Sequence, residues 1–207
     1  MSKPVFMSDF HRVLDAAGRA EIKIKGSRFI AEAVPVSSAL EAEEALQAIR
    51  KREYDATHHC SAWRIDPEGV EFRWSDDGEP SNSAGLPIFR HIEGRDLFGT
   101  AVVVTRYYGG TKLGTGGLIR AYGEAASLAL DAARVREVIP RTRLTLRFAY
   151  DDTSPAMHLL SQYDTVVAGT RYSDETEIDV DVRNRDLAPF QAAFVEALSG
   201  RGRIEPA

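Results

Sequence analysis

Three stretches in the first half of the chain carry side chains whose types and spacing could bind a ligand or do chemistry. Two neighbouring histidines lie in an apolar stretch, three carboxylates lie in a short turn, and a glycine-rich loop carries basic and aromatic residues. Together they give the candidate binding residues His58, His59, Asp76, Asp77, Glu79, Arg106, Tyr107, Tyr108, Gly109, Gly110, Lys112, Gly114, Thr115, Gly116 and Gly117.

The histidines are expected on a strand, because Cys60, Ala62 and Trp63 follow them. Adjacent residues of a strand point to opposite faces, so His58 and His59 cannot chelate one ion together. His58 and Cys60 share a face, but zinc normally takes three or four protein ligands. The pattern therefore favours a structural or hydrogen-bonding role for these residues and predicts no metal.

The acidic turn, SDDGEP at 75–80, places Asp76, Asp77 and Glu79 within four residues. Carboxylates so close together could hold a hard cation or act as acid and base. They do not follow the calcium-loop pattern, in which oxygen ligands alternate over twelve positions. A solvated acidic turn and a functional site are both compatible with this stretch.

The loop RYYGGTKLGTGG, at 106–117, looks like a phosphate cradle but matches neither common motif. A P-loop would need Lys and Ser or Thr where Thr115 and Gly116 stand, and Ile119 occupies the last glycine of a dinucleotide fingerprint. Free amides at a helix start, with Arg106 and Lys112 nearby, still predict a concavity that accepts an anion. The alternative is that the glycines let the loop pack closely.

The elements that must position these residues follow from periodicity. The apolar β-branched run 101–105 predicts a buried strand before the loop, and a helix is predicted at 118–133 with Leu118, Ala121, Tyr122, Ala125, Leu128, Ala129 and Ala132 on its inner side. Upstream we expect a lead-in at 1–18, strands at 21–25 and 28–36, and a helix with Ser38 and Glu41 as capping box and an apolar stripe of Leu40, Ala42, Ala45, Leu46 and Ile49. That helix ends in the basic run 50–52, which is most simply a solvated helix end.

Two further elements complete the first half. We expect a strand with Val70, Phe72 and Trp74, and then a helix that is capped by Ser81 or Ser83 and continues through Ile92.

The second half has a different pattern, with Pro140 as a plausible boundary. Strands are predicted at 142–150, 165–172, 175–183 and 203–205, and helices start at Ser154-Pro155 and at Asp186. This βαββαβ order is that of a ferredoxin-like domain. The predicted class is thus α+β with two domains, 1–138 and 139–207.

The exposed face of this second sheet is predicted to be solvated and salt-bridged. Three arginines on its first strand face three acids on its third: Arg141, Arg143 and Arg147 against Glu177, Asp179 and Asp181. Such a salt-bridged surface differs from the aromatic platform of an RNA-recognition module.

The bulk composition limits the possible classes of protein. A net charge of −5 argues against a protein that simply coats nucleic acid. The single cysteine, Cys60, cannot form an internal disulfide, which fits a reducing cytoplasm. We see neither a signal-peptide core nor a run long enough to span a bilayer, so a cytoplasmic protein without membrane contact is expected.

Four segments resemble the IMPACT/YigZ family: SRFI at 27–30, DATHHCSAW at 55–63, SDDGEPSNSAG at 75–85 and VVVTRYYGGTKLGTGGLIRAYG at 102–123. The resemblance implies an N-terminal α/β domain similar to domain IV of elongation factor G. In bacterial members the second half resembles domain V of that factor. Eukaryotic relatives are regulators of translation that act on activation of an amino-acid-starvation kinase, through an additional N-terminal domain that this chain is expected to lack. The resemblance implies no catalytic residues and no cofactor.

These observations leave three hypotheses about function. The first is a translation-linked regulatory or binding protein whose first domain contacts RNA, the ribosome or a translation factor complex. The second is a metal-assisted enzyme acting on a phosphorylated or anionic small molecule, with the ion at Asp76, Asp77 and Glu79, His58 as acid or base, and the anion at the 109–117 loop. The third is a protein-interaction module with Tyr107 and Tyr108 at its edge. Binding is favoured over turnover.

Overall fold

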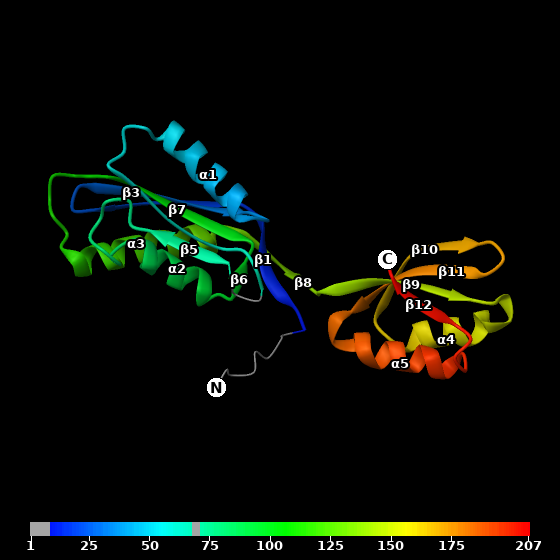
Figure 1. The fold of residues 1–207 in the computed structure, drawn as a ribbon. Helices are drawn as coiled ribbons and strands as arrows, with labels where there is room; N and C mark the ends of the chain where they lie inside the picture. The colour runs from blue at the N-terminus through cyan, green and yellow to red at the C-terminus, as the bar shows by residue number, and fades with distance from the viewer. Residues whose placement is uncertain (1–8, 68–70) are drawn as a thin grey trace. The chain divides into compact units, whose positions relative to one another are not determined.

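The computed structural model describes residues 9–67 and 71–207 (Figure 1). The described chain forms two compact units, one of residues 11–138 and one of residues 139–207 with residues 9 and 10. Each unit combines a sheet with helices, so the predicted α+β class is confirmed. Among the described residues, no helix is both long and apolar enough to cross a membrane.

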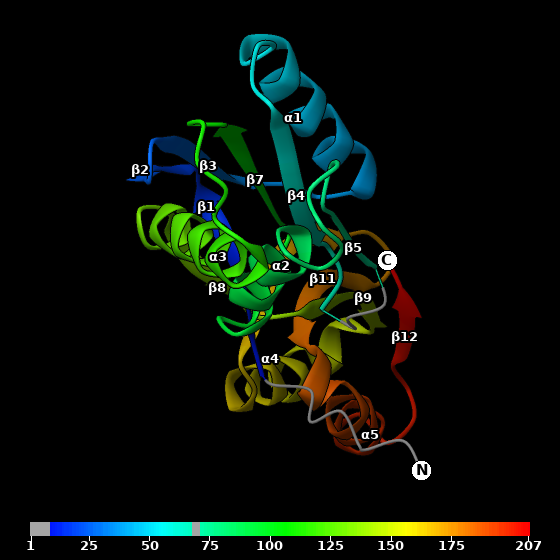
Figure 2. The same cartoon turned by 90° about the vertical axis from the view of Figure 1, so that its left-hand side faces the viewer.

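The first unit is built on an antiparallel five-stranded sheet. Its strands, in spatial order, are β2 (Gly18–Ile24), β3 (Ser27–Pro35), β7 (Thr100–Tyr107), β4 (His58–Arg64) and β5 (Phe72–Ser75). Helices α2 (Gly85–Glu93) and α3 (Thr115–Asp131) cover one face, and α1 (Ala39–Arg52) lies on the other (Figure 2). The predicted buried strand before the glycine-rich loop is therefore the central strand, β7.

Alternation along β4 and β7 decides which side chains meet which helices. Cys60 and Ala62, with Val102 and Val104, lie in the main core beneath α2 and α3. The intervening residues face α1, where Val103 packs against Leu46 and Ile49. Because β4 and β7 are paired neighbours, each sheet face presents side chains from both strands at matching positions.

In this unit one prediction is wrong and one strand is missing from the predictions, because partners far apart in the sequence decide the structure. Residues 11–18 are not a lead-in: β1 (His11–Ala16) pairs with β6 (Leu97–Phe98) and β8 (Arg134–Val138), and β2 starts at Gly18. Strand β8 was not predicted at all. Val70 lies outside the described residues.

The helices follow the predicted periodicity except at their margins. Ser38 caps α1 by accepting a bond from the Glu41 amide at 3.2 Å, but the Glu41 carboxylate bonds Ser37 and not the Ser38 amide. Leu40 is 69% exposed, so it does not belong to the apolar stripe. Leu128 on α3 and Ala132 directly after its end are exposed, so the buried stripe is narrower than predicted.

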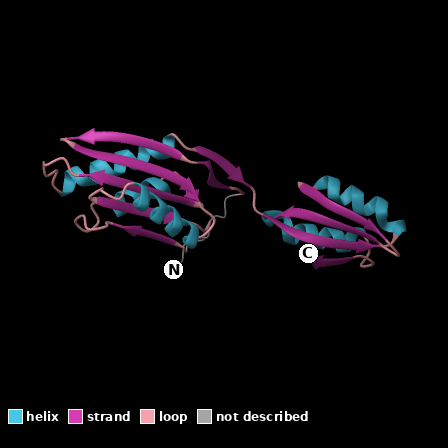
Figure 3. Cartoon of the chain, turned by 90° about the horizontal axis from the view of Figure 1, so that it is seen from above, coloured by secondary structure: helices cyan, strands magenta, loops and turns pink. Residues whose placement is uncertain are grey.

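The second unit has the predicted βαββαβ order. Its elements are β9 (Arg141–Phe148), a 3-10 turn (Tyr150–Asp152), α4 (Thr153–Gln162), β10 (Thr165–Tyr172), β11 (Thr176–Arg183), a 3-10 turn (Asn184–Asp186), α5 (Leu187–Ala197) and β12 (Arg203–Pro206). The sheet order β10-β11-β9-β12 is ferredoxin-like, and both helices cover one face (Figure 3).

The other face of this sheet carries the predicted ion pairs. The register sets Arg143 opposite Asp181 and Arg147 opposite Glu177, with closest distances of 2.7 and 3.0 Å between charged atoms. Arg141 instead pairs with Asp164. The prediction of a salt-bridged surface is confirmed.

Candidate functional site

The centre of the candidate site is the buried carboxylate of Glu79, which is 9% exposed. Its Oε1 accepts hydrogen bonds from Arg106 Nη1 at 2.5 Å and from the Tyr122 hydroxyl at 2.7 Å. His58 Nε2 lies 3.9 Å from the same oxygen. Alternation along β7 turns Arg106 toward α2 and α3, so the turn, the central strand and α3 meet at one oxygen.

Arg106 also fixes the start of the glycine-rich loop. Its Nη2 donates to Ser27 Oγ at 3.3 Å, and the Gly109 amide donates to the same oxygen at 3.2 Å. Gly109 approaches the β2–β3 turn so closely that a Cβ there would lie 1.9 Å from the Gly26 carbonyl carbon. Glycine at 109 is thus required for packing, which the sequence left open as the alternative reading of the loop.

Asp76 caps α2, a role that the sequence assigned to Ser81 or Ser83. Its Oδ1 accepts from the amides of Ala84 at 2.9 Å and Gly85 at 2.8 Å, and its Oδ2 accepts from Asn82 at 2.7 Å. The Ser81 and Ser83 prediction is wrong, because the chain turns back and brings an upstream carboxylate to the helix start. Carboxylate bonding to free amides is favourable at the positive end of a helix.

Asp77 ties the turn to α1. Its Oδ1 accepts from Arg50 Nη2 at 2.5 Å, and its Oδ2 accepts from the His59 amide at 2.6 Å. Its backbone carbonyl lies 2.8 Å from His58 Nδ1. Arg50, at the basic helix end, is therefore engaged rather than simply solvated.

The two histidines point apart, as predicted for neighbours on a strand. His59 turns to the α1 face, where its Nε2 lies 3.1 Å from the Glu53 carbonyl, and burial lowers its pKa. Among the described residues, no three His, Cys, Asp or Glu side chains are grouped so as to hold a metal ion. The three carboxylates of the turn instead contact protein donors.

Cys60 and Tyr122 are buried beneath this network. Burial raises the pKa of the Cys60 thiol, and its Sγ donates to the Asp76 carbonyl at 3.0 Å. Burial also raises the pKa of Tyr122, which keeps its hydroxyl protonated as a donor to Glu79. Both groups support the turn from inside.

The exposed part of the site is the loop after β7. Tyr108 is 47% exposed, and its ring centre lies 5.5 Å from Arg106 Cζ. Lys112 is exposed, and Gly110 and Gly114 have φ of 84° and 68°, which favour glycine. Residues 115–117 form the first turn of α3, whose start at Gly114 has no side-chain cap. The exposed amides and Lys112 together suit an anion.

Tyr107, on the other side of the loop, is engaged in hydrogen bonds and is not free to contact a partner. Its hydroxyl donates to Glu53 Oε2 at 2.8 Å and Asp55 Oδ1 at 3.0 Å. Burial and these bonds raise the pKa of Tyr107 to about 12. Arg28 Cζ lies 4.5 Å from its ring centre.

Comparison with protein-family models gives a match in each half of the chain. Residues 25–130 match the Impact N-terminal domain, and residues 146–201 match a domain of unknown function, DUF1949. The chain belongs to the IMPACT family. The first match covers β3 to α3 and so includes every candidate residue of the site.

Relatives in the IMPACT family extend over most of the chain. The IMPACT family member YvyE of Bacillus subtilis is 36% identical over 91% of this chain and 87% of its own length. The member YigZ of Escherichia coli is 32% identical over 86% and 88%. A solved structure described as that of a hypothetical protein aligns with a TM-score of 0.67 at 29% identity, covering 97% of this chain and 98% of the other.

The structure joins some predicted residues and separates others. His58, Glu79 and Arg106 meet, whereas Asp76 and Asp77 are directed to α2 and α1. The sequence missed Tyr122 and Arg50 as partners of the turn. The signal for Tyr122 was its place on a buried helical face, since a buried tyrosine hydroxyl needs a hydrogen-bond partner.

Proposed function

We propose that this protein is a translation-linked binding protein whose N-terminal domain contacts RNA, as free RNA or on the ribosome, through the loop of residues 108–117. Family membership supports the link to translation, because the IMPACT family is associated with it. Family and fold alone do not assign a binding surface, so the surface is argued from the loop.

The observation that carries the proposal is the uncapped start of α3 beside an exposed lysine and an exposed tyrosine. Backbone amides at residues 115–117 and Lys112 suit a phosphate group, and the half-exposed ring of Tyr108 suits stacking by an unpaired base. Arg106 and Gly109 anchor the loop from below through Ser27, which reduces the ordering needed on binding.

The C-terminal sheet is a poorer RNA surface. Its open face pairs Arg143 with Asp181 and Arg171 with Asp179, each at under 3 Å, so the arginines there are already neutralised. Phosphate would have to displace carboxylates held in register by the strands. The N-terminal loop is therefore the favoured contact.

The experiment is co-sedimentation of the full chain with ribosomes, and filter binding to single-stranded RNA, across a salt series. We expect binding that weakens as salt rises, because phosphate contacts release counterions. Lys112→Gln should weaken binding by about threefold to tenfold and reduce the salt slope by roughly one. Tyr108→Ala should weaken it by about tenfold at constant slope.

Lys51→Gln is the matched control, since Lys51 is an exposed lysine on α1, across the sheet from the loop. Absence of binding at about 50 mM salt, where electrostatic contacts are strong, would refute the proposal. Equal losses in Lys51→Gln and Lys112→Gln would also count against it, because they would indicate a general charge effect.

A further inference from the structure

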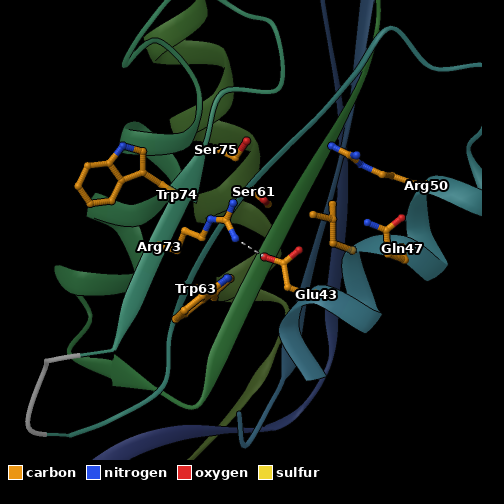
Figure 4. Close-up of a pocket in the computed structure, with 9 residues that line it drawn as sticks. Glu43, Gln47, Arg50, Ser61, Trp63, Arg73, Trp74 and Ser75 are labelled. Atoms are coloured by element: carbon orange, nitrogen blue, oxygen red, sulfur yellow. Dashed lines mark hydrogen bonds and ion pairs between the residues drawn. The ribbon is translucent and has the colours of Figure 1, made fainter. Parts of the chain in front are cut away.

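A separate pocket lies on the α1 side of the N-terminal sheet, between α1 and the β4–β5 hairpin (Figure 4). It has a volume of about 140 Å³. Arg50 and Glu43 line it from the helix, while Ser61, Trp63 and Arg73 line it from the sheet. None of these residues belongs to the loop proposed to contact RNA.

Strand register explains why a hollow forms here. Ser61 pairs with Ser75 and Trp63 pairs with Arg73 across β4 and β5. The two serines are too small to fill the space under α1, whereas Leu46 and Ile49 pack further in, against Val103 of β7. The pocket is therefore bounded by an apolar seam on one side and the edge strand on the other.

The inner end of the pocket presents a hydrogen-bond donor that the protein does not use. Arg50 is fixed by its 2.5 Å bond from Nη2 to Asp77, and its Nε is buried with no partner among the described residues. Ser61, 7% exposed, adds a hydroxyl close to the same space. A buried donor without an acceptor is unfavourable, so an incoming oxyanion would satisfy it.

The mouth of the pocket is closed only by a weak contact. Arg73 Nη1 lies 3.1 Å from Glu43 Oε1, and these side chains are 64% and 40% exposed. Exposed pairs of this kind contribute little to stability, so Arg73 can exchange Glu43 for a ligand anion at small cost. Beside it the half-buried indole of Trp63 offers a flat apolar wall.

We propose that this pocket binds a phosphate monoester carrying a planar ring, the chemistry of a nucleoside monophosphate. The phosphate accepts bonds from Arg50 Nε, Ser61 and Arg73, and the ring lies on Trp63. A volume of about 140 Å³ admits the phosphate group beside Arg50 and Ser61, and the ring lies at the mouth, on Trp63.

The test is fluorescence titration of the full chain with adenosine monophosphate, inorganic phosphate and adenosine as separate probes. The chain has two tryptophans: the Trp63 indole lines the pocket, whereas the Trp74 indole packs against Phe89 on the other face of the sheet and supplies a constant background. We expect saturable quenching by the monophosphate and at least about tenfold weaker binding of phosphate or adenosine alone, because each supplies only part of the contacts.

Arg50→Gln and Ser61→Val should each weaken binding of the monophosphate by about tenfold or more. Ser61→Val guards against a loss caused only by breaking the Arg50–Asp77 pair. Arg52→Gln is the matched control, since Arg52 lies on the same helix but pairs with Glu32 and Glu53. A cooperative thermal transition would show that each variant is folded.

Absence of saturable quenching up to about 5 mM monophosphate overturns the proposal. So does adenosine binding as tightly as the monophosphate, or affinity retained in both Arg50→Gln and Ser61→Val. These results are independent of RNA binding, which the Lys112 and Tyr108 variants measure.

Discussion

Glu79→Gln tests whether the buried pair with Arg106 stabilises the N-terminal domain. The two side chains are 4% and 6% exposed, so the substitution leaves the Arg106 charge buried without a counter-charge. Breaking such a pair costs about 3–5 kcal/mol. Glutamine keeps an oxygen that can accept from Tyr122, which places the expected loss of unfolding free energy near the lower limit, about 3 kcal/mol.

Urea denaturation followed by tryptophan fluorescence measures this loss. Trp63 and Trp74 both lie in the N-terminal unit, so the signal reports that unit alone. For a domain of this size about 3 kcal/mol corresponds to a fall in melting temperature of roughly 10 °C. Glu43→Gln is the control, because its exposed pair with Arg73 should be worth less than about 1 kcal/mol.

A double-mutant cycle with Arg106→Met separates the ion pair from the loss of packing. The double variant should recover about 2 kcal/mol or more relative to the sum of the single variants, since neither charge is then left alone. A Glu79→Gln change of under about 0.5 kcal/mol, or simple additivity in the cycle, would refute this account of the pair.

Three further predictions, made with four substitutions, test the local architecture. Gly109→Ala should cost about 3 kcal/mol or more, because its Cβ would meet Gly26 at 1.9 Å, whereas Gly110→Ala, in open space at φ 84°, should cost only about 1 kcal/mol; urea midpoints compare the two. Asp76→Ala should lower the unfolding free energy by about 2 kcal/mol, because three amides lose their acceptor, and weaker hydrogen-exchange protection at the start of α2 would locate the loss. Tyr107 has its pKa raised from 10.0 to about 12, so its stabilising contribution is present below pH 10 and is lost as pH rises toward 12; Tyr107→Phe should remove that part of the alkaline destabilisation, measured by urea midpoints against pH.

The sequence predicted those parts of the fold that depend on local patterns. The strand composition of β4, the apolar run of β7 and the βαββαβ order needed no knowledge of distant partners, and each was confirmed. Strand β8 was missed because its alternation is weak and its pairing with β1 joins the two ends of the domain. Pairing between strands far apart in the sequence cannot be recognised from the pattern of a short sequence segment.

The candidate site was predicted as a set of residues but not as a geometry. Proximity in sequence favours a joint role for Asp76, Asp77 and Glu79, yet a turn with positive φ at Asp77 and Gly78 sends their side chains in different directions. One carboxylate reaches α2, one reaches α1 and one reaches Arg106. The spacing of acidic residues in the sequence cannot predict these different directions, because they depend on the tight turn and on where the helices lie.

This divergence explains how one short turn can serve both faces of the sheet. Asp77 holds Arg50 above the α1-side pocket, while Glu79 holds Arg106 beneath the glycine-rich loop on the other side. Among the described residues, the Nε of each arginine is buried without a hydrogen-bond partner, so the two arginines differ in what else they contact. Arg106 supports the loop backbone through Ser27 and Glu79, so its removal should act on stability first. Arg50 lines the pocket, so its removal should act on ligand affinity as well. Stability and binding measurements on the same pair of variants therefore distinguish a supporting arginine from one that contacts a ligand.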